Sequence, residues 1–360
     1  MWFVINREEF LKILSPVSKV IPTKTPYPII QNVYISVEDK KLICIGTDLD
    51  SYIKTWTEIE AEENKVLIPG KKLIEIVKEV KENEVSIGIE DNKFILQSGR
   101  SKFSIPLLDA GEFPDLLASP QGVALDINST VLIKGYEKTK ITVSKQLDRP
   151  SMTGILMDIR AEELRFVSTD GYRLSFYSVP GEFGTKTQLI ISPKVFGFLP
   201  DGDYLVKFSY DDSKMEFSFS WMEIRSRLIE GPYPDYEKVI PSEVKNKLYV
   251  NRDGILSAIR RVMILSDEHT RRVKFKIAGE GVTLQASTPE GGEATEIVEG
   301  EYQGEPLEVI YNGRYLVEII NLIDSDRIVI GMNDSSSPGV VFGEGQEKSP
   351  MYLLMPIVME

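Results

Sequence analysis

Pairs of acidic residues are the first place in this sequence to look for chemistry, because two neighbouring carboxylates can divide the roles of general acid and general base. Such pairs stand at Asp48 and Asp50, at Asp211 and Asp212, and at Asp324 and Asp326. Each pair adjoins a strand-like run, a place where Asp is favoured because its side chain bonds the nearby backbone. We therefore interpret these acids as turn residues.

The residues that most often serve as nucleophiles, bases and metal ligands are scarce. The sequence contains one histidine, His269, and one cysteine, Cys44. A single cysteine excludes an intrachain disulfide and any metal site with two cysteine ligands. No nucleophile, base and orienting group can be assembled around His269. The stretch Gly184-Thr-Lys-Thr lacks the first glycine of a phosphate-binding loop. We predict no catalytic residue, no metal site and no cofactor.

The positions of the basic residues are more informative than those of the acidic ones, because the chain as a whole is acidic. Lys and Arg number 42 against 55 Asp and Glu, which gives a net charge of −13. The helix predicted over 128–145 nevertheless carries four lysines and one glutamate. Lys134, Lys138 and Lys145 are spaced i, i+4 and i+11, so they fall on one stripe of that helix.

Other predicted helices and the loops that follow them repeat this polarity. Their basic residues are Lys12, Lys19, Lys24, Lys71, Lys72, Lys78, Arg252, Arg260, Arg261, Arg271 and Arg272. On any single helix such a run is usually a solvated face. Its recurrence favours one basic surface, which suits a partner held by its phosphate backbone without reading of its bases.

The elements that must position these residues recur three times along the chain. A strand, a turn that begins with Thr and a second strand occupy residues 41–56, 163–178 and 281–298. A helix precedes each hairpin, over residues 7–21, 128–145 and 251–265. A shorter helix is predicted over 70–82, 192–199 and 312–323, and a basic strand leads to aromatic-Pro-Asp within 98–116 and 224–239.

Recurrence in one order indicates three similar domains, at residues 1–121, 122–242 and 243–360. Units of this length are whole domains rather than the short repeats of a solenoid. Many short alternating strands around two helices predict an α+β fold, with the helices gathered on one side of antiparallel sheet.

Five short motifs give the chain a resemblance to a known family. They are Gly46-Thr-Asp-Leu-Asp, Phe113-Pro-Asp-Leu, Ser168-Thr-Asp-Gly-Tyr-Arg-Leu, Tyr233-Pro-Asp-Tyr and Leu353-Leu-Met-Pro-Ile. Together with the threefold repeat, they resemble the bacterial β sliding clamps, the processivity subunits of DNA polymerase III. The resemblance implies a clamp of three similar domains, each with two inner helices and an outer antiparallel sheet, closed by two chains head to tail. Such a ring is no enzyme.

The same resemblance implies the partners and the residues that would face them. The ring would encircle duplex DNA without sequence specificity and tether the replicative polymerase, the clamp loader and other proteins with clamp-binding peptides. Residues placed near DNA by resemblance are Lys24, Lys71, Lys72, Gln146, Arg149, Lys194 and Arg271, beside the stripe of Lys134, Lys138 and Lys145. The contact between the two chains would join Phe103 and Ile105 to Ile264 and Leu265. Some relatives have paired tyrosines where this chain has Pro150 and Ser151.

Partner peptides would bind in a cleft between the second and third domains. The cleft residues implied by resemblance are Met152, Thr169, Gly171, Tyr172, Arg173, Leu174, Pro234, Lys238, Val239, Asn312, Tyr315, Leu353, Leu354, Met355, Pro356 and Ile357. Methionines that adapt their shape, an aromatic rim and one guanidinium make a plausible peptide groove.

Two other classes of protein stay open at this point. A repeat-built scaffold that binds peptides but not DNA predicts no clustering of basic residues on the helical side. A hydrolase that depends on carboxylates requires two of the turn aspartates to meet in one pocket with raised pKa values. No apolar run is long enough for a transmembrane helix, and charges follow Met1-Trp-Phe-Val-Ile too soon for a signal peptide. We expect a cytoplasmic protein.

Overall fold

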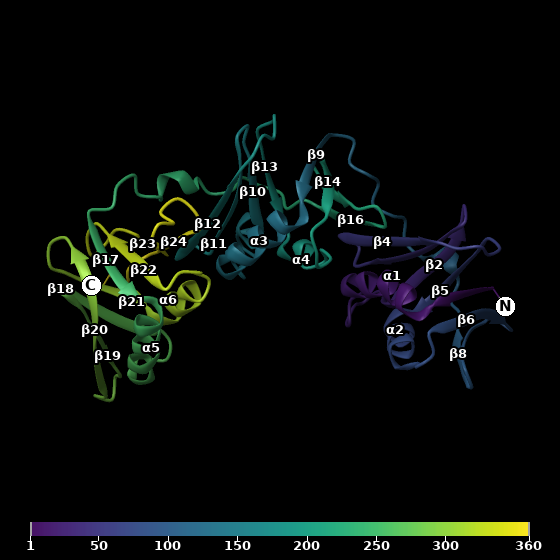
Figure 1. Ribbon diagram of the computed structural model, residues 1–360, viewed down its shortest axis with the longest axis horizontal. Coiled ribbons are helices and arrows are strands. Elements are labelled where there is room, and N and C mark those ends of the chain that lie inside the picture. The colour runs from purple at the N-terminus through teal and green to yellow at the C-terminus, as the bar shows by residue number, and fades with distance from the viewer. Residues whose placement is uncertain (1, 359–360) are drawn as a thin grey trace. The chain divides into compact units, whose positions relative to one another are not determined.

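The computed structural model describes residues 2–358, and the chain forms two compact units (Figure 1). One unit contains residues 1–132 and 194–228, and the other contains residues 133–193 and 229–360. Each unit is built on antiparallel sheet. Among the described residues, no helix is long and apolar enough to cross a membrane.

The first unit contains an eight-stranded sheet of order β5-β2-β3-β4-β16-β15-β14-β9 and a four-stranded sheet of order β1-β6-β7-β8. Their strands are β1 (Phe3–Asn6), β2 (Asn32–Glu38), β3 (Lys41–Thr47), β4 (Ser51–Glu58), β5 (Asn64–Pro69), β6 (Glu84–Glu90), β7 (Lys93–Ser98), β8 (Ser101–Pro106), β9 (Val123–Asn128), β14 (Leu205–Tyr210), β15 (Lys214–Ser218) and β16 (Met222–Arg227). Helices α1 (Arg7–Val20) and α2 (Gly70–Glu79) lie side by side, α1 on β3 and β4 and α2 on β2 and β5 (Figure 1).

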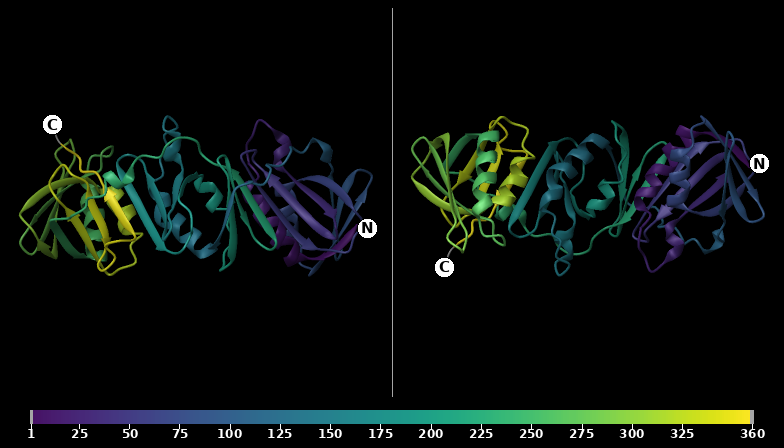
Figure 2. Two further views of the ribbon diagram at one scale, coloured as in Figure 1. Left: turned by 90° about the horizontal axis from the view of Figure 1, so that it is seen from above. Right: turned by 90° about the horizontal axis from the view of Figure 1, so that it is seen from below.

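The second unit contains one twelve-stranded sheet of order β13-β10-β11-β12-β24-β23-β22-β17-β20-β19-β18-β21. Its strands are β10 (Ile155–Ile159), β11 (Glu163–Thr169), β12 (Arg173–Pro180), β13 (Thr187–Ile191), β17 (Asn246–Asn251), β18 (Arg272–Ala278), β19 (Gly281–Ser287), β20 (Glu293–Gln303), β21 (Leu307–Asn312), β22 (Arg327–Met332), β23 (Gly339–Gly343) and β24 (Met351–Leu354). Helices α5 (Arg252–Val262) and α6 (Gly313–Ile320) pack against each other, as the right panel of Figure 2 shows.

Asparagine begins the first helix of every repeat. The side-chain oxygen of Asn6 accepts a hydrogen bond from the Glu8 N–H, that of Asn128 from the Thr130 N–H, and that of Asn251 from the Gly254 N–H, each at 2.9 Å. Such caps satisfy N–H groups that the first helical turn leaves without a partner. This recurrence is a further repeat signal in the sequence, and our sequence analysis missed it.

The turn aspartates close hairpins, as the sequence analysis predicts. Asp48 Oδ1 accepts from the Ser51 N–H at 2.7 Å, and Asp170 Oδ1 accepts from the Arg173 N–H at 3.0 Å. Burial alone would raise the pKa of Asp211, but hydrogen bonds from Ser213 and its neighbours hold that pKa below its usual range. These acids therefore stabilise turns, and the lowered pKa of Asp211 does not suit a general acid.

Two predicted helices are shorter than expected. Helix α3 (Ser129–Thr139) ends well before residue 145, and a 3-10 turn over Lys140–Thr142 follows it. The Thr142 hydroxyl donates to the carbonyl of Ser168 on the sheet, which holds this segment away from a helical path. Thr142 and Val143 are also β-branched, and such residues extend helices poorly. Lys145 therefore lies in a loop, and the predicted stripe through Lys145 is wrong. The helix expected over 192–199 is reduced to α4 (Pro193–Phe196).

Candidate partner-binding cleft and basic surface

An apolar cavity of about 200 Å³ lies in the second unit, where two of the repeated elements meet. Strand β12 pairs with the C-terminal strand β24, with Leu174 opposite Leu353. Both leucines are buried and line the cavity. The complete lining is Arg149, Met152, Thr169, Gly171, Tyr172, Arg173, Leu174, Pro234, Asp235, Tyr236, Val239, Pro338, Leu353 and Met355.

Local structure explains why the cavity is open. Gly171 adopts a left-handed φ of +88° in the β11–β12 turn, and a Cβ there would lie 3.7 Å from the terminal carbon of Met152. The turn thus presents backbone to the cavity with no side chain over it. Tyr172 and Met355 stand at the rim with 59% and 41% of their surface exposed. Exposed apolar rims over a buried apolar floor are typical of peptide-binding grooves.

Arg173 is the one charged group that is buried in the cavity lining. Its guanidinium donates to Asp170 at 3.0 Å, to Glu318 at 2.6 Å and to the carbonyl of Ile141 at 2.8 Å. The group also lies 4.1 Å from the centre of the Tyr315 ring. Burial raises the pKa of that tyrosine. Four neighbours therefore fix the position of the guanidinium before any ligand arrives.

The structure brings together ten of the sixteen residues that resemblance placed in the cleft. Asn312 and Tyr315 instead line an adjoining hollow of about 600 Å³, which shares Tyr172 and Arg173 with the cavity. Lys238 is exposed and forms an ion pair with Asp235 at 2.9 Å. The remaining three of the sixteen do not line the cavity: Leu354 and Pro356 are buried, and the N–H of Ile357 donates to the carbonyl of Ile310.

Three lining residues were missed by sequence reasoning. Asp235 and Tyr236 belong to the Tyr233-Pro-Asp-Tyr motif, so the motif itself was the signal that could have placed them. Pro338 carries no such signal. Arg149, which resemblance placed near DNA, also lines the cavity.

Basic residues implied in DNA contact occur in both units. In the first unit, Lys24, Lys71 and Lys72 are exposed, the last two in the first turn of α2, and Lys194 forms an ion pair with Asp48.

In the second unit, Lys134 is exposed on α3, whereas Lys138 donates to Asp324 at 2.5 Å and to the carbonyl of Leu322 at 2.6 Å. The structure thus leaves Lys134 more available to a phosphate than Lys138. Lys145, Gln146 and Arg271 line the 600 Å³ hollow together with His269.

Two of the four residues implied in the chain-to-chain contact lie on an edge strand, and the other two lie in a turn after a helix. Phe103 and Ile105 are on β8, an edge strand of the four-stranded sheet, where Ile105 is buried and Phe103 is partly exposed. Ile264 and Leu265 follow α5 in a 3-10 turn over Met263–Leu265, with 76% and 38% of their surface exposed. Exposed leucine and isoleucine side by side favour a protein contact.

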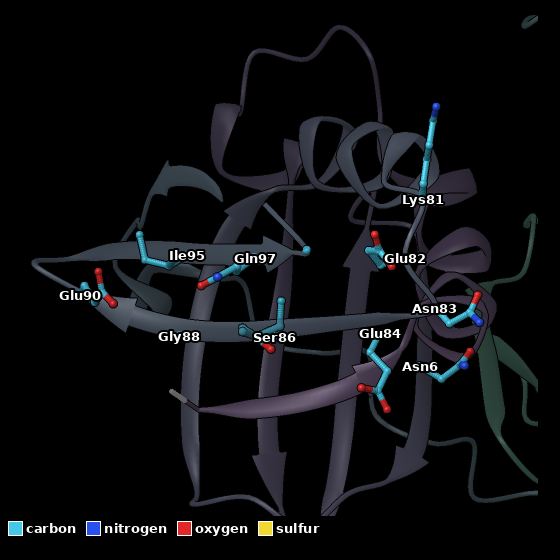
Figure 3. A pocket seen from close by; sticks show the side chains of 12 residues that line it. Asn6, Lys81, Glu82, Asn83, Glu84, Ser86, Gly88, Glu90, Ile95 and Gln97 are labelled. Carbon is cyan, nitrogen blue, oxygen red and sulfur yellow. The ribbon is translucent and has the colours of Figure 1, made fainter. Parts of the chain in front are cut away.

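A larger cavity of about 870 Å³ lies on the four-stranded sheet of the first unit (Figure 3). Ser86 and Gln97 lie on its neighbouring strands, and Glu82, Glu84 and Glu90 surround them, while Lys81 points away. Glu90 forms an ion pair with Lys102 at 3.1 Å. The lining is polar, and nothing in it assembles acid, base and nucleophile.

Comparison with known proteins accounts for nearly the whole chain. Residues 1–117, 126–235 and 237–358 match the N-terminal, central and C-terminal domains of the DNA polymerase III beta subunit. The beta sliding clamp of Pseudomonas putida is 28% identical over 99% of this chain and 100% of its own length, and that of Caulobacter vibrioides is 29% identical over the same shares.

A solved structure agrees. The crystal structure of a DnaN sliding clamp from Pseudomonas aeruginosa bound to griselimycin matches with a TM-score of 0.95 at 28% identity, and the match covers 100% of both chains. Sequence motifs, repeated architecture and these matches lead to one conclusion. The chain belongs to the DNA polymerase III beta-subunit family, the bacterial sliding clamps, which are three-domain, non-catalytic processivity subunits.

Proposed function

We propose that two copies of this chain close head to tail into a ring around duplex DNA and tether the replicative polymerase and other clamp-binding proteins there. The three domains of each copy would have boundaries near 121 and 242, and the protein would work in the cytoplasm with the clamp loader. The observation that carries this proposal is the repeated way in which the domains join.

Two junctions inside the chain share one strand register. At the first, β16 pairs with β4, with Arg225 opposite Tyr52. At the second, β24 pairs with β12, with Leu353 opposite Leu174. Tyr52 and Leu174 hold the same place in their hairpins, because each lies opposite the threonine that ends the preceding strand.

The third hairpin and the first domain supply the two missing halves of such a junction. Glu293 lies opposite Ser287, the residue that ends strand β19, so it corresponds to Tyr52 and Leu174. Strand β8 corresponds to β16. Pro106 lies opposite Lys93, the first residue of β7, and Arg227 lies opposite Lys214, the first residue of the equivalent strand β15. Within the described chain, β8 has β7 as its only sheet neighbour, so its other edge is free. Strand β20 pairs with β17 only from Gly300 onward, so one edge of its earlier part is free as well.

If β8 of one copy pairs with β20 of the other in the register that the two inner junctions share, the residues in contact can be specified. Ser104 would lie opposite Glu293 of the second copy, Phe103 opposite Ala294 and Ile105 opposite Gly292. A Cβ on Gly292 would stand 3.4 Å from a methyl carbon of Leu265, so Leu265 would reach Phe103 and Ile105. The pairs derived from register thus agree with the contact that resemblance implied. A head-to-tail contact of this kind produces a ring when its rotation closes.

The basic residues and the cleft then take separate roles. Lys24, Lys71, Lys72, Lys134, Lys145, Gln146, Arg149 and Arg271 would meet phosphates, with Lys138 and Lys194 contributing less because acids already hold them. The cavity over Leu174 and Leu353 would receive short, partly apolar peptide segments of partners. We further propose that it is the site for griselimycin, because a similar clamp from Pseudomonas aeruginosa binds that molecule and this apolar cavity with a fixed guanidinium is shaped to hold a ligand.

The mass in solution tests the ring most simply. One chain has a mass of 40.7 kDa, and sedimentation equilibrium at micromolar concentration should give twice that value. A monomer at that concentration would refute the closed ring and leave a peptide-binding scaffold as the better reading.

A further inference from the structure

One wall of the proposed cleft is made by the segment that links the second domain to the third. Pro234, Asp235, Tyr236 and Val239 line the cavity from this segment, which forms no strand and has only a 3-10 turn over Tyr236–Lys238. A wall of irregular chain needs attachments elsewhere if it is to keep its shape without a ligand.

Backbone bonds attach the linker only near its ends in the described structure. The N–H of Ile229 donates to the carbonyl of Ile190, and the carbonyl of Glu243 accepts from the side chain of Asn333. Between them, the side chains of Tyr233, Tyr236 and Glu237 reach the sheet.

Tyr236 makes the strongest of these attachments. Its ring is 3% exposed and lies 6.2 Å from the ring of Phe176. Its hydroxyl donates to Asp158 Oδ2 at 2.5 Å, and accepts from Arg165 at 2.9 Å and from Arg160 at 3.1 Å. Burial raises the pKa of Tyr236 to about 12, so the hydroxyl keeps its proton and remains a donor at neutral pH.

Two partners of that hydroxyl lie on neighbouring strands of the sheet, and the third, Arg160, directly follows β10. Asp158 on β10 lies directly opposite Arg165 on β11 and is fully buried. Arg160 donates to Asp158 at 2.8 Å, and Glu237 of the linker pairs with Arg160 at 3.1 Å and with Arg165 at 2.8 Å. Hydrogen bonds from these two arginines lower the pKa of Glu237. Acids and guanidiniums therefore alternate from the sheet to the linker, and each buried charge has an opposite neighbour.

We propose that Asp158, Arg160 and Arg165 are positioning residues for the cleft, acting through Tyr236 to hold its linker wall in the binding-competent place. None of the three lines the cavity. The effect on ligand binding rests on the proposed function of the cleft, whereas the attachment of the linker to the sheet does not. A wall released from this cluster would spend less time in the competent place, and apparent affinity falls by that fraction.

Two measurements on the full chain test the proposal, with griselimycin as the probe. Tyr236→Phe removes the hydroxyl and keeps the ring. Tyr233→Phe is the matched control, because the Tyr233 hydroxyl bonds backbone groups, the carbonyl of Val167 at 3.4 Å and the backbone of Thr169, whereas the Tyr236 hydroxyl bonds charged side chains. Loss of a hydrogen bond to a charged partner should raise the ratio of released to attached wall about tenfold in Tyr236→Phe and weaken griselimycin binding by up to that factor. Amide hydrogen exchange over residues 232–241 should accelerate by a similar factor, while exchange in β10 and β11 stays unchanged. Tyr233→Phe should match the wild type in both.

Conservative replacement separates positioning from general loss of stability. Arg165→Met should weaken binding and speed linker exchange as Tyr236→Phe does, and Arg165→Lys should recover most of both, because an ammonium can still reach Glu237 and the hydroxyl. Unchanged linker exchange in Tyr236→Phe would overturn the proposal whether or not griselimycin binds. Faster linker exchange with undiminished affinity would overturn the positioning role. A wild type that does not bind griselimycin would instead refute the proposed griselimycin site, and faster linker exchange in Tyr236→Phe would still support the attachment.

Discussion

A carboxylate at Ile264 and at Leu265 is expected to convert the proposed dimer into monomers. Both side chains lie exposed in the single chain, so Ile264→Asp with Leu265→Asp should leave its fold intact. In the proposed contact they are covered by Phe103 and Ile105 of the second copy. An uncompensated buried charge costs about 4 kcal/mol, which raises a dissociation constant about a thousandfold.

Sedimentation and thermal unfolding check this result together. The variant should sediment as a 40.7 kDa particle, with unfolding like that of a well-folded chain. Leu205→Asp is the matched control, because Leu205 is 72% exposed on β14, far along the chain from the proposed contact. A double variant that stays dimeric at nanomolar concentration would show that the chains join elsewhere.

Acidic substitutions at the cleft rim should produce the second large effect. Val239 and Met355 are 45% and 41% exposed, so Val239→Asp with Met355→Asp leaves the buried floor untouched. A ligand seated in the cavity would cover both positions and bury two carboxylates without partners. Removing one polar group from water unpaired costs at least about 1–3 kcal/mol, so two such groups should lower griselimycin affinity at least about thirtyfold.

Calorimetric titration of the wild type and the rim variant measures that loss. Val358→Asp serves as the control, since Val358 is 66% exposed near the same end of the chain but does not line the cavity. The control should bind griselimycin like the wild type, and all three proteins should have the same sedimentation coefficient. Undiminished binding by the rim variant would remove the cavity from the proposed function.

Much of the fold could be predicted because each repeat carries the same local signals. The Thr-Asp turns predict hairpins, and the structure has them at Asp48 and Asp170. Helix lengths were harder to predict. The pattern of lysines extends to Lys145, but the Thr142 hydroxyl binds Ser168, a residue distant in sequence. A tertiary bond of this kind ends the helix, and periodicity alone contains no information about it.

In the candidate site too, residues within motifs could be predicted, and contacts between distant elements could not. Leu174 and Leu353 could be placed in the cleft because they lie within motifs, whereas Pro338 lies in none. Lys138 has the right spacing for a basic stripe, yet Asp324 from another element holds it. Ion pairs between distant elements depend on packing, which one sequence does not display. The positioning cluster of Asp158, Arg160 and Arg165 was invisible for this reason.

An acidic ring needs more than attraction to stay on DNA. At −13 per chain, long-range steering toward a polyanion should be poor, and direct binding weakens with salt at a log–log slope of about −0.9 for each neutralised phosphate. Retention would then depend on topology, because a closed ring cannot leave a closed circle however weak each contact is.

Release on linearisation tests that claim most directly. Rings assembled by a clamp loader on circular duplex should survive a wash at moderate salt, and one double-strand cut in the circle should then release them within minutes as they slide off the ends. Loading on a circle that stays uncut provides the reference. Protein that remains equally bound after the cut would contradict encirclement and would mean that an ordinary DNA-binding surface holds it.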